Sequence, residues 1–115
     1  MEIFRWETMP LEQLTKNIRR RMIVGKKEML VQWEFDKDAV AARHSHPHEQ
    51  IVMMIQGKLQ LIVEGETTIM EPGSIVVIPP NASHEACALE KTVVIDIFSP
   101  PREDFISGKM PAYLQ

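Results

Sequence analysis

Apolar and polar residues alternate with a period of two along much of the chain. Residues 31–35 and 58–64 carry an aliphatic or aromatic side chain at every second position, with polar side chains between them except at Ile62. This pattern is typical of β-strands that have one buried and one solvated face. The stretch from Leu11 to Met22 fits both helical and strand spacing, and we expect a short turn near Leu11 followed by a strand.

Turn-forming residues separate these segments at intervals of about eight to ten residues. They cluster at 25–26, 36–38, 57–58, 64–66, 71–73 and 79–81. Together with the lack of a long, unambiguous helical pattern, this rhythm predicts an all-β fold, a small sandwich or barrel. Only residues 100–115 change character, and we expect a short C-terminal tail with a helical turn packed outside the barrel.

The length of 115 residues allows one compact domain, which we expect to span residues 1–115. Apolar residues make up 44% and charged residues 25%, a balance typical of a globular protein. We expect no membrane segment, because the longest aliphatic runs have only the length of strands. The first residues lack the pattern of a signal peptide, and Cys87 is the single cysteine, so we expect a mature cytoplasmic chain without an internal disulfide.

The net charge of −3 argues against a nucleic-acid-binding protein, which usually carries a basic face. The main basic cluster is formed by residues 19–21 with Lys26 and Lys27. In an extended segment Arg20 points away from its two neighbours. We expect a solvated strand edge protected by charge here, in preference to a phosphate-binding patch.

The four histidines suggest a metal site. His44, His46 and His48 fall within five residues, and His84 follows a Pro-Pro-Asn turn. On a strand His44, His46 and Gln50 share one face, so two imidazole nitrogens and an amide oxygen can converge inside a barrel. A histidine from a neighbouring strand would complete the ligand set for a divalent transition metal ion. The alternative is a group of histidines that only form hydrogen bonds in the core.

A second informative segment surrounds Asp96, which interrupts an apolar strand pattern and shares its face with Phe98. A carboxylate in such a strand needs a partner or a wet cavity. In one alternative Asp96 points outward at the surface and Phe98 lies at the rim of the barrel. In the other, Asp96 and Phe98 both line the mouth of the metal cavity, and Arg102 folds back beside them.

The histidine segments resemble the two motifs of the cupin family. The first is the run HSHPHEQ at 44–50, followed by six residues and Gly57, and the second is Gly73, five residues and PPNASH at 79–84. The resemblance implies a cupin fold, a double-stranded β-helix or jelly-roll barrel. Gln50 stands where many cupins carry glutamate, and it can still coordinate through its carbonyl oxygen. Asn81 replaces a glycine, a tolerable change because asparagine accepts positive φ.

The run at 44–50, together with Asp96, Phe98, Arg102 and the following Glu-Asp-Phe, resembles the small KdgF-type cupins of pectin and alginate breakdown. These proteins convert 4,5-unsaturated monouronates to linear keto forms. The resemblance implies four metal ligands, two catalytic residues and a substrate-binding set. The ligands are His44, His46, Gln50 and His84; the catalytic residues are Asp96 and Arg102; the substrate contacts are Phe98, Arg102 and His48. We expect Pro47 to bend the strand so that His48 lies in the pocket without binding the metal.

All four expected ligands are neutral when bound, so a divalent ion would keep its full positive charge and attract an anionic sugar. Nickel, zinc, iron, manganese and copper all suit such ligands. Two other functions stay open: a metal-dependent oxygenase of a small molecule, and a non-catalytic metal- or sugar-binding cupin. Small cupins commonly pair through sheet edges, and we expect a homodimer.

Overall fold

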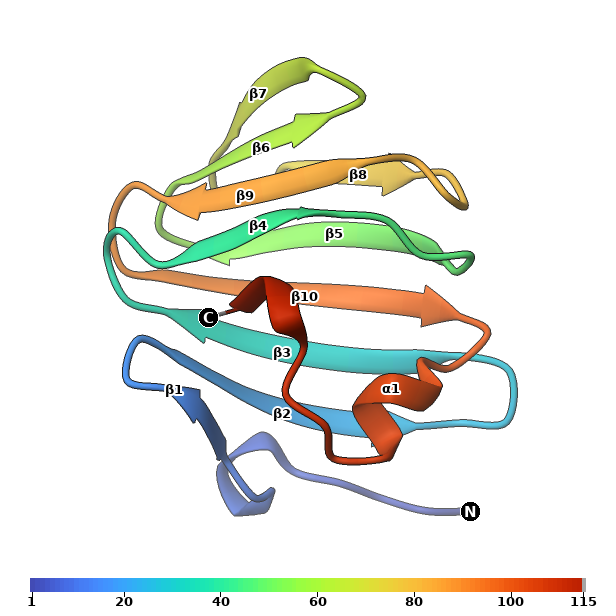
Figure 1. Ribbon diagram of the computed structural model, residues 1–115. Coiled ribbons are helices and arrows are strands. Elements are labelled where there is room, and N and C mark those ends of the chain that lie inside the picture. The colour runs from blue at the N-terminus through green and yellow to red at the C-terminus, as the bar shows by residue number, and fades with distance from the viewer. Residues whose placement is uncertain (115) are drawn as a thin grey trace.

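The computed structural model describes residues 1–114, and ten strands dominate this part of the chain (Figure 1). The elements are η1 (Trp6–Thr8), β1 (Glu12–Thr15), β2 (Ile18–Val24), β3 (Met29–Phe35), β4 (Val40–His44), β5 (Glu49–Gln56), β6 (Leu59–Val63), β7 (Glu66–Met70), β8 (Ile75–Ile78), β9 (His84–Ala88), β10 (Thr92–Ser99), α1 (Glu103–Ile106) and η2 (Ala112–Leu114). Within the described residues, no helix has both the length and the apolar character needed to cross a bilayer.

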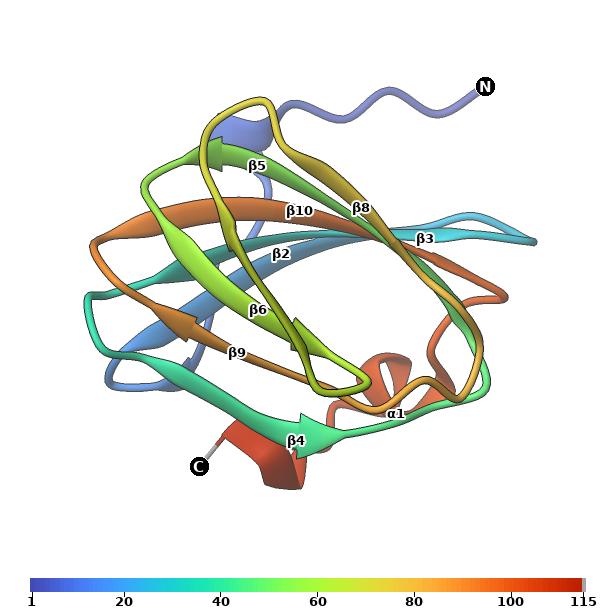
Figure 2. The ribbon, with the colours of Figure 1, turned by 90° about the horizontal axis from the view of Figure 1, so that it is seen from above.

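Two antiparallel sheets face each other and enclose the core (Figure 2). The larger sheet has the order β1-β2-β3-β10-β5-β8, and the smaller has the order β4-β9-β6-β7. The connections from β3 to β4 and from β4 to β5 cross between the sheets, as in a jelly-roll barrel. The prediction of an all-β cupin barrel is confirmed.

The period-two pattern decides which side chains fill the barrel. In β3 Met29, Val31, Trp33 and Phe35 are buried, and the residues between them are more exposed. β10 follows the same rule, with Thr92, Val94, Asp96 and Phe98 inside. A carboxylate therefore occupies an inward position between two apolar side chains.

Two turns show why particular residues stand at the ends of the histidine motifs. Gly57 has φ +93°, and a Cβ at this position would lie 2.2 Å from the carbonyl oxygen of Lys91. Only glycine allows this close approach. Asn81 has φ 67°, which confirms that asparagine takes the left-handed conformation expected of the glycine it replaces.

The environment of Arg20 corrects the expectation of a solvated strand edge. β2 lies between β1 and β3, and the side chain of Arg20 is fully buried on its inner face. Its guanidinium carbon lies 4.7 Å from the ring centre of Phe105 and 5.7 Å from that of Trp33. Arg20 Nε donates to Glu12 at 2.8 Å, whereas Nη1 and Nη2 have no hydrogen-bond partner. β2 thus directs Arg20 into the barrel, whereas Arg19 and Arg21 pair with acidic residues on the outer face.

The C-terminal tail contains the expected helical turn in α1, but it does not simply pack outside the barrel. Phe105 and Leu114 are buried, and η2 contacts β4 at the mouth of the barrel (Figures 1 and 2). The expectation of an external tail is wrong because apolar side chains at 105 and 113–114 complete the core.

Candidate metal centre

Three histidines converge at one end of the barrel. His44 ends β4 and His84 begins β9, and the two residues are direct partners in the antiparallel pair. His46 follows in the connection to β5. One ring nitrogen of each histidine lies within 4.8 Å of the others. The strand register therefore builds a cluster from segments about forty residues apart in the sequence.

Backbone carbonyls fix the orientation of two of the rings. Nδ1 of His44 lies 2.7 Å from the carbonyl oxygen of Ala42, and Nδ1 of His84 lies 2.8 Å from that of Ala82. A ring that donates through Nδ1 presents the lone pair of Nε2, which is the usual arrangement of metal-binding histidines. Nε2 of His84 is buried without a hydrogen-bond partner. Such an orphaned acceptor fits a metal ligand.

Gln50 lies where the sequence predicts a fourth donor, and it forms a hydrogen bond with His46. Its Oε1 lies 3.0 Å from Nε2 of His46. Two ligands that bind one ion at right angles, each at about 2.1 Å, are about 3.0 Å apart. His46 and Gln50 therefore fit neighbouring positions around a single ion, and the neutral donor set suits a divalent transition metal.

Burial keeps these histidines neutral. It lowers the pKa of His44 and of His46 to about 4, and the neighbouring histidines and Arg102 act in the same direction. Burial also lowers the pKa of His84. Because a metal competes with protons for the imidazole lone pair, neutral rings at physiological pH are ready to bind one.

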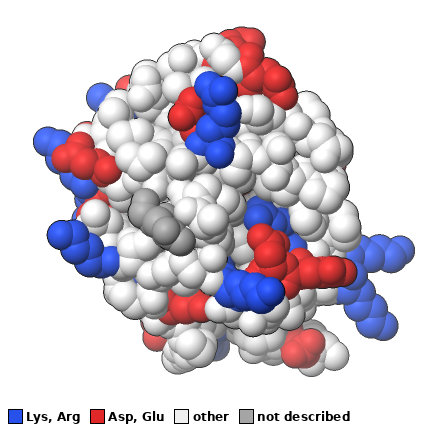
Figure 3. Space-filling view, in the orientation of Figure 1, with Lys and Arg blue, Asp and Glu red and all other residues white. Residues whose placement is uncertain are grey.

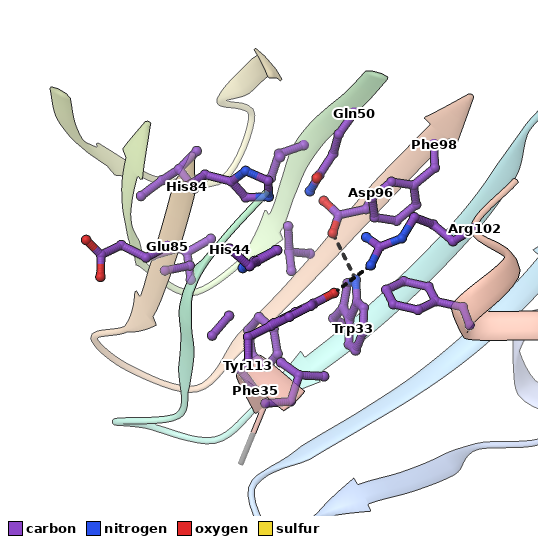
Figure 4. A pocket seen from close by; sticks show the side chains of 18 residues that line it. Trp33, Phe35, His44, Gln50, His84, Glu85, Asp96, Phe98, Arg102 and Tyr113 are labelled. Atoms are coloured by element: carbon purple, nitrogen blue, oxygen red, sulfur yellow. Dashed lines mark hydrogen bonds between the residues drawn. The ribbon is translucent and has the colours of Figure 1, made fainter. Parts of the chain in front are cut away.

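Asp96 faces the histidines from β10, in agreement with the alternative that placed it inside the cavity (Figure 4). Its Oδ2 accepts a hydrogen bond of 2.9 Å from Nε1–H of Trp33, and its Oδ1 is buried without a partner. Burial raises the pKa of Asp96 to about 7, although the neighbouring Gln50 amide, Trp33 and Arg102 act in the opposite direction. A carboxyl group with this pKa can both donate and accept a proton near neutrality.

Arg102 lies beside Asp96 and is only 3% exposed. Its guanidinium carbon lies 4.0 Å from the ring centre of Phe105 and 5.1 Å from that of Phe98. Nε and Nη2 donate to the two carboxylate oxygens of Asp104 at 2.9 and 2.7 Å. One edge of the guanidinium is thus already paired with an acid from α1.

These side chains line a cavity of about 50 Å³ (Figure 4). Of the residues predicted from the sequence, His44, Gln50, His84, Asp96, Phe98 and Arg102 border it. His46 closes the cluster, with its ring centre 5.0 Å from that of His84 and 5.6 Å from that of Phe98. The structure therefore brings the predicted metal ligands and the predicted reactive groups to one place.

His48 is the exception. It does not border this cavity but lines a separate open groove with Lys26, Pro101 and Asp104. The expectation that His48 contacts a substrate in the cavity does not agree with this placement, because its ring lies between the turn after β2 and the start of the tail. Its ring centre lies 5.3 Å from that of His46, although His48 is not part of the cluster of His44, His46 and His84. That His48 does not itself bind the metal stays a prediction.

The sequence analysis did not identify two residues of the site, Trp33 and Tyr113. Trp33 belongs to the alternating segment 31–35 and is buried, and its indole N–H also donates a hydrogen bond to Asp96. Tyr113 stacks on His44, with ring centres 3.5 Å apart and planes 1° apart, and its hydroxyl lies 3.1 Å from Nη2 of Arg102. The inward parity of Trp33 with Val31 could have suggested its position, whereas the tail around Tyr113 has no periodic signal.

On the face that carries the tail, acidic and basic side chains lie side by side, and much of the surface is uncharged (Figure 3). Such mixing leaves little long-range field to attract a ligand of one sign. The positive charge available to an anion inside the cavity is the local charge of Arg102, together with that of a bound ion.

Comparison with known proteins identifies relatives of the whole barrel. The Cupin_2 (cupin domain) family matches residues 31–98. The pectin degradation protein KdgF of Dickeya dadantii (strain 3937) is 35% identical over 100 residues, which cover 84% of this chain and 91% of that protein. The structure of KdgF from Halomonas sp. has a TM-score of 0.87 and 33% identity, and the match covers 91% of this chain and 98% of that one. An RmlC-like cupin from Shewanella frigidimarina has a TM-score of 0.87 and 29% identity, over 91% and 96% of the two chains.

Proposed function

Because the chain belongs to the cupin family and is a KdgF-type member of it, we propose that it is a metal-dependent enzyme that converts 4,5-unsaturated monouronates from pectin or alginate breakdown to linear keto forms. The observation that carries the proposal is the meeting of three histidines and Gln50 with Asp96, Phe98 and Arg102 around one cavity. The similarity to KdgF supports the same pathway, since that relative is named for pectin degradation.

His44, His46, Gln50 and His84 would hold a single divalent ion, with nickel, zinc, iron, manganese and copper as candidates. Bound there, the ion would supply Lewis acidity that polarises sugar oxygens and stabilises negative charge on oxygen. The protein contributes neutral ligands, which do not diminish the charge of the ion, and backbone carbonyls that orient His44 and His84.

Asp96 is the proposed proton carrier. The cyclic substrate is a hemiacetal with an enol ether between C4 and C5. In the conversion the C1 hydroxyl loses its proton, the bond from C1 to the ring oxygen breaks, and C4 gains a proton as C5 becomes a ketone. The product is an isomer of the substrate, so the reaction needs no other reactant. A carboxyl group with a pKa of about 7 suits both transfers.

Arg102 and Phe98 are the proposed substrate contacts. The guanidinium would bind the carboxylate of the sugar through the edge that Asp104 leaves free. Phe98 would provide an apolar wall for the sugar ring, and its own position is fixed by Arg102 and Phe105.

The proposal is tested by turnover of the 4,5-unsaturated galacturonate monomer, followed through the loss of its ultraviolet absorbance. Metal-loaded wild type, chelated protein and His46→Ala are compared with the spontaneous rate. We expect acceleration by the metal-loaded wild type only. Absence of acceleration by fully metallated protein would overturn the uronate assignment, and oxygen uptake would then distinguish an oxygenase from a binding protein.

We also propose that the protein is a homodimer that pairs through the outer face of the larger sheet. The register aligns an aliphatic row across five strands, formed by Ile23, Leu30, Ile97, Ile51 and Val77. Val77 is 57% exposed, and α1 and η2 lie on the other side of the barrel (Figure 2). An apolar sheet face of this kind suits the same face of a second copy of the chain.

Analytical ultracentrifugation tests this interface. We expect a monomer for Ile97→Lys and a dimer for Ile69→Lys, which changes an exposed residue of the smaller sheet. A monomeric wild type would contradict the proposal.

A further inference from the structure

The hydrogen bonds of Arg102 leave a limited number of donors for a ligand. A guanidinium has five N–H groups, two on each terminal nitrogen and one on Nε. Asp104 takes the edge formed by Nε and Nη2. A carboxylate that binds with two hydrogen bonds must therefore use the other edge, formed by Nη1 and the second hydrogen of Nη2.

Tyr113 occupies this second edge. Nη2 of Arg102, which already donates to Asp104, also donates to the Tyr113 hydroxyl oxygen at 3.1 Å. The aromatic ring of Tyr113 at the same time lies flat against His44. The phenol thus extends from His44, a proposed metal ligand, to Arg102, the proposed carboxylate-binding residue (Figure 4).

The size of the cavity indicates that the tail must move. With Tyr113 and Leu114 among its walls, the cavity measures about 50 Å³. On this measure a cavity needs about 10–15 Å³ to hold one water molecule, and pockets for small organic ligands start at about 300 Å³. The cavity in this conformation holds an ion with a water molecule but not a monouronate.

The tail is attached in a way that permits such movement. Within the described residues, the backbone hydrogen bonds of Ile106–Leu114 run to carbonyls of residues 102–111, none of which belongs to a barrel strand. Gly108 has φ +77° with open space around it, and residues 106–110 are exposed. The end of the tail is therefore held against the barrel by side chains, those of Pro111, Tyr113 and Leu114.

We infer that residues 107–114 form a gate and that Tyr113 is its latch: the phenol holds the edge of Arg102 that a uronate carboxylate takes, and leaves when the substrate enters. The identity of the ligand rests on the proposed function. The latch adds the same opening cost for every ligand that displaces the tail. A carboxylate can replace the lost hydrogen bond from Arg102, whereas a neutral sugar leaves that edge of the guanidinium unpaired. Tyr113 is thus a residue that limits the affinity of the site.

Tyr113→Phe separates the latch from the ring stack, because it removes the hydroxyl and keeps the aromatic face against His44. We expect the metal-loaded variant to bind saturated galacturonate about three- to tenfold more tightly than wild type in calorimetry, since no hydrogen bond has to be replaced. Galactose, which has no carboxylate but must displace the same tail, serves as the control ligand; we expect it to bind more weakly than galacturonate to both proteins and to gain by a similar factor. Equal or weaker binding of galacturonate by the variant would overturn the inference.

A second measurement does not need the ligand. Trypsin cleavage after the exposed Lys109 reports detachment of the tail, and Lys109→Gln identifies that cleavage by its loss. Ligand-free Tyr113→Phe should be cleaved there several-fold faster than wild type, and galacturonate should accelerate cleavage of wild type. Equal rates for the two ligand-free proteins would overturn the latch. If galacturonate binds neither protein while Tyr113→Phe is cleaved faster, the result would contradict uronates as the substrate class but support the tail as a gate held by Tyr113.

Discussion

Trp33 donates the hydrogen bond from its indole Nε1 to Oδ2 of Asp96 over 2.9 Å, although 63 positions separate the two residues in the chain. β3 and β10 are neighbours in the larger sheet, and Asp96 pairs with Val31, two residues before Trp33 on the same face. The indole is therefore a diagonal cross-strand neighbour of the carboxyl group. It fixes one oxygen and leaves the other directed at the cavity.

Removal of this hydrogen bond should change the acidity of Asp96. The indole N–H stabilises the charged carboxylate, so Trp33→Phe should raise the pKa of Asp96 further, by roughly half a unit to one unit. The pH profile of kcat should shift upward by the same amount. Trp6→Phe, which changes the other tryptophan outside the cavity, is the control. An unshifted profile in Trp33→Phe would show that Asp96 does not control the profile.

Asp96 should also make stability depend on pH. Its folded pKa of about 7 lies above the ordinary value of 3.8, so the folded protein holds a proton that the unfolded chain has released. The stability from this group is fully present below about pH 4 and is lost as the pH rises through 7. Relative to wild type, Asp96→Asn should gain a few kcal/mol between pH 4 and 8, measured by urea unfolding of metal-free protein. If the free energy of unfolding of wild type and of Asp96→Asn depended on pH in the same way, this prediction would be contradicted.

His44 and His46 should make the stability depend on pH in the opposite direction to Asp96. The pKa values of His44 and His46 are lowered to about 4 from 6.5, so the unfolded chain binds protons that the folded protein does not. The stability from neutral rings is present above pH 6.5 and is lost as the pH falls through 4. We expect bound metal to be retained down to about pH 4 and to be released only below it, where protons compete for the folded rings, detectable by elemental analysis after dialysis at stepped pH. Complete release of metal above pH 6 would contradict this expectation.

Two single histidine substitutions should distinguish a proposed metal ligand, His84, from a histidine outside the cluster, His48. His84→Ala removes an orphaned buried nitrogen and should weaken metal binding by at least roughly 100-fold. His48→Ala lies in the outer groove and should change the affinity by less than about threefold. Metal titration with a chromophoric competitor measures both. Similar losses in the two variants would mean that His48 also contacts the ion.

Arg20 allows a test of what its buried charge contributes. Two of its nitrogens have no partner, while its stem and guanidinium fill the space between Phe105 and Trp33. Arg20→Met keeps most of this volume and removes the unpaired donors, so the free energy of unfolding should change by less than about 1 kcal/mol. Arg20→Ala should lower it by about 2–4 kcal/mol through the cavity it leaves. A large loss in both variants would show that the charge itself is needed.

Parity and motif spacing were sufficient to predict the barrel, most of its inner positions and the convergence of His44, His46 and His84. Their binding of a metal together with Gln50 stays a prediction. The alternation at 31–35 became β3, and the two cupin motifs placed Gly57 and Asn81 at turns that require their conformations. Arg20 shows the limit of this approach. Its parity pointed inward, but its charge favoured solvent, and only the aromatic rings of Trp33 and Phe105 explain its burial.

Tyr113 could not be placed from the sequence for another reason. It lies in a tail with Pro111 and Gly108, where no period relates a side chain to the barrel. Its position depends on contacts with His44 and Arg102, which are 69 and 11 positions away. His48 was placed by local spacing alone, and the path of the chain after Pro47 carries it to the other groove.

The pairing of His44 opposite His84 would let a bound metal ion favour correctly folded chains. A slip of one residue between β4 and β9 would turn one of the two imidazoles toward the outside of the barrel. A misaligned chain would then lack a complete ligand set. Uptake of the ion would therefore select molecules whose two strands are correctly aligned, and metal availability would influence the yield of native protein as well as its activity.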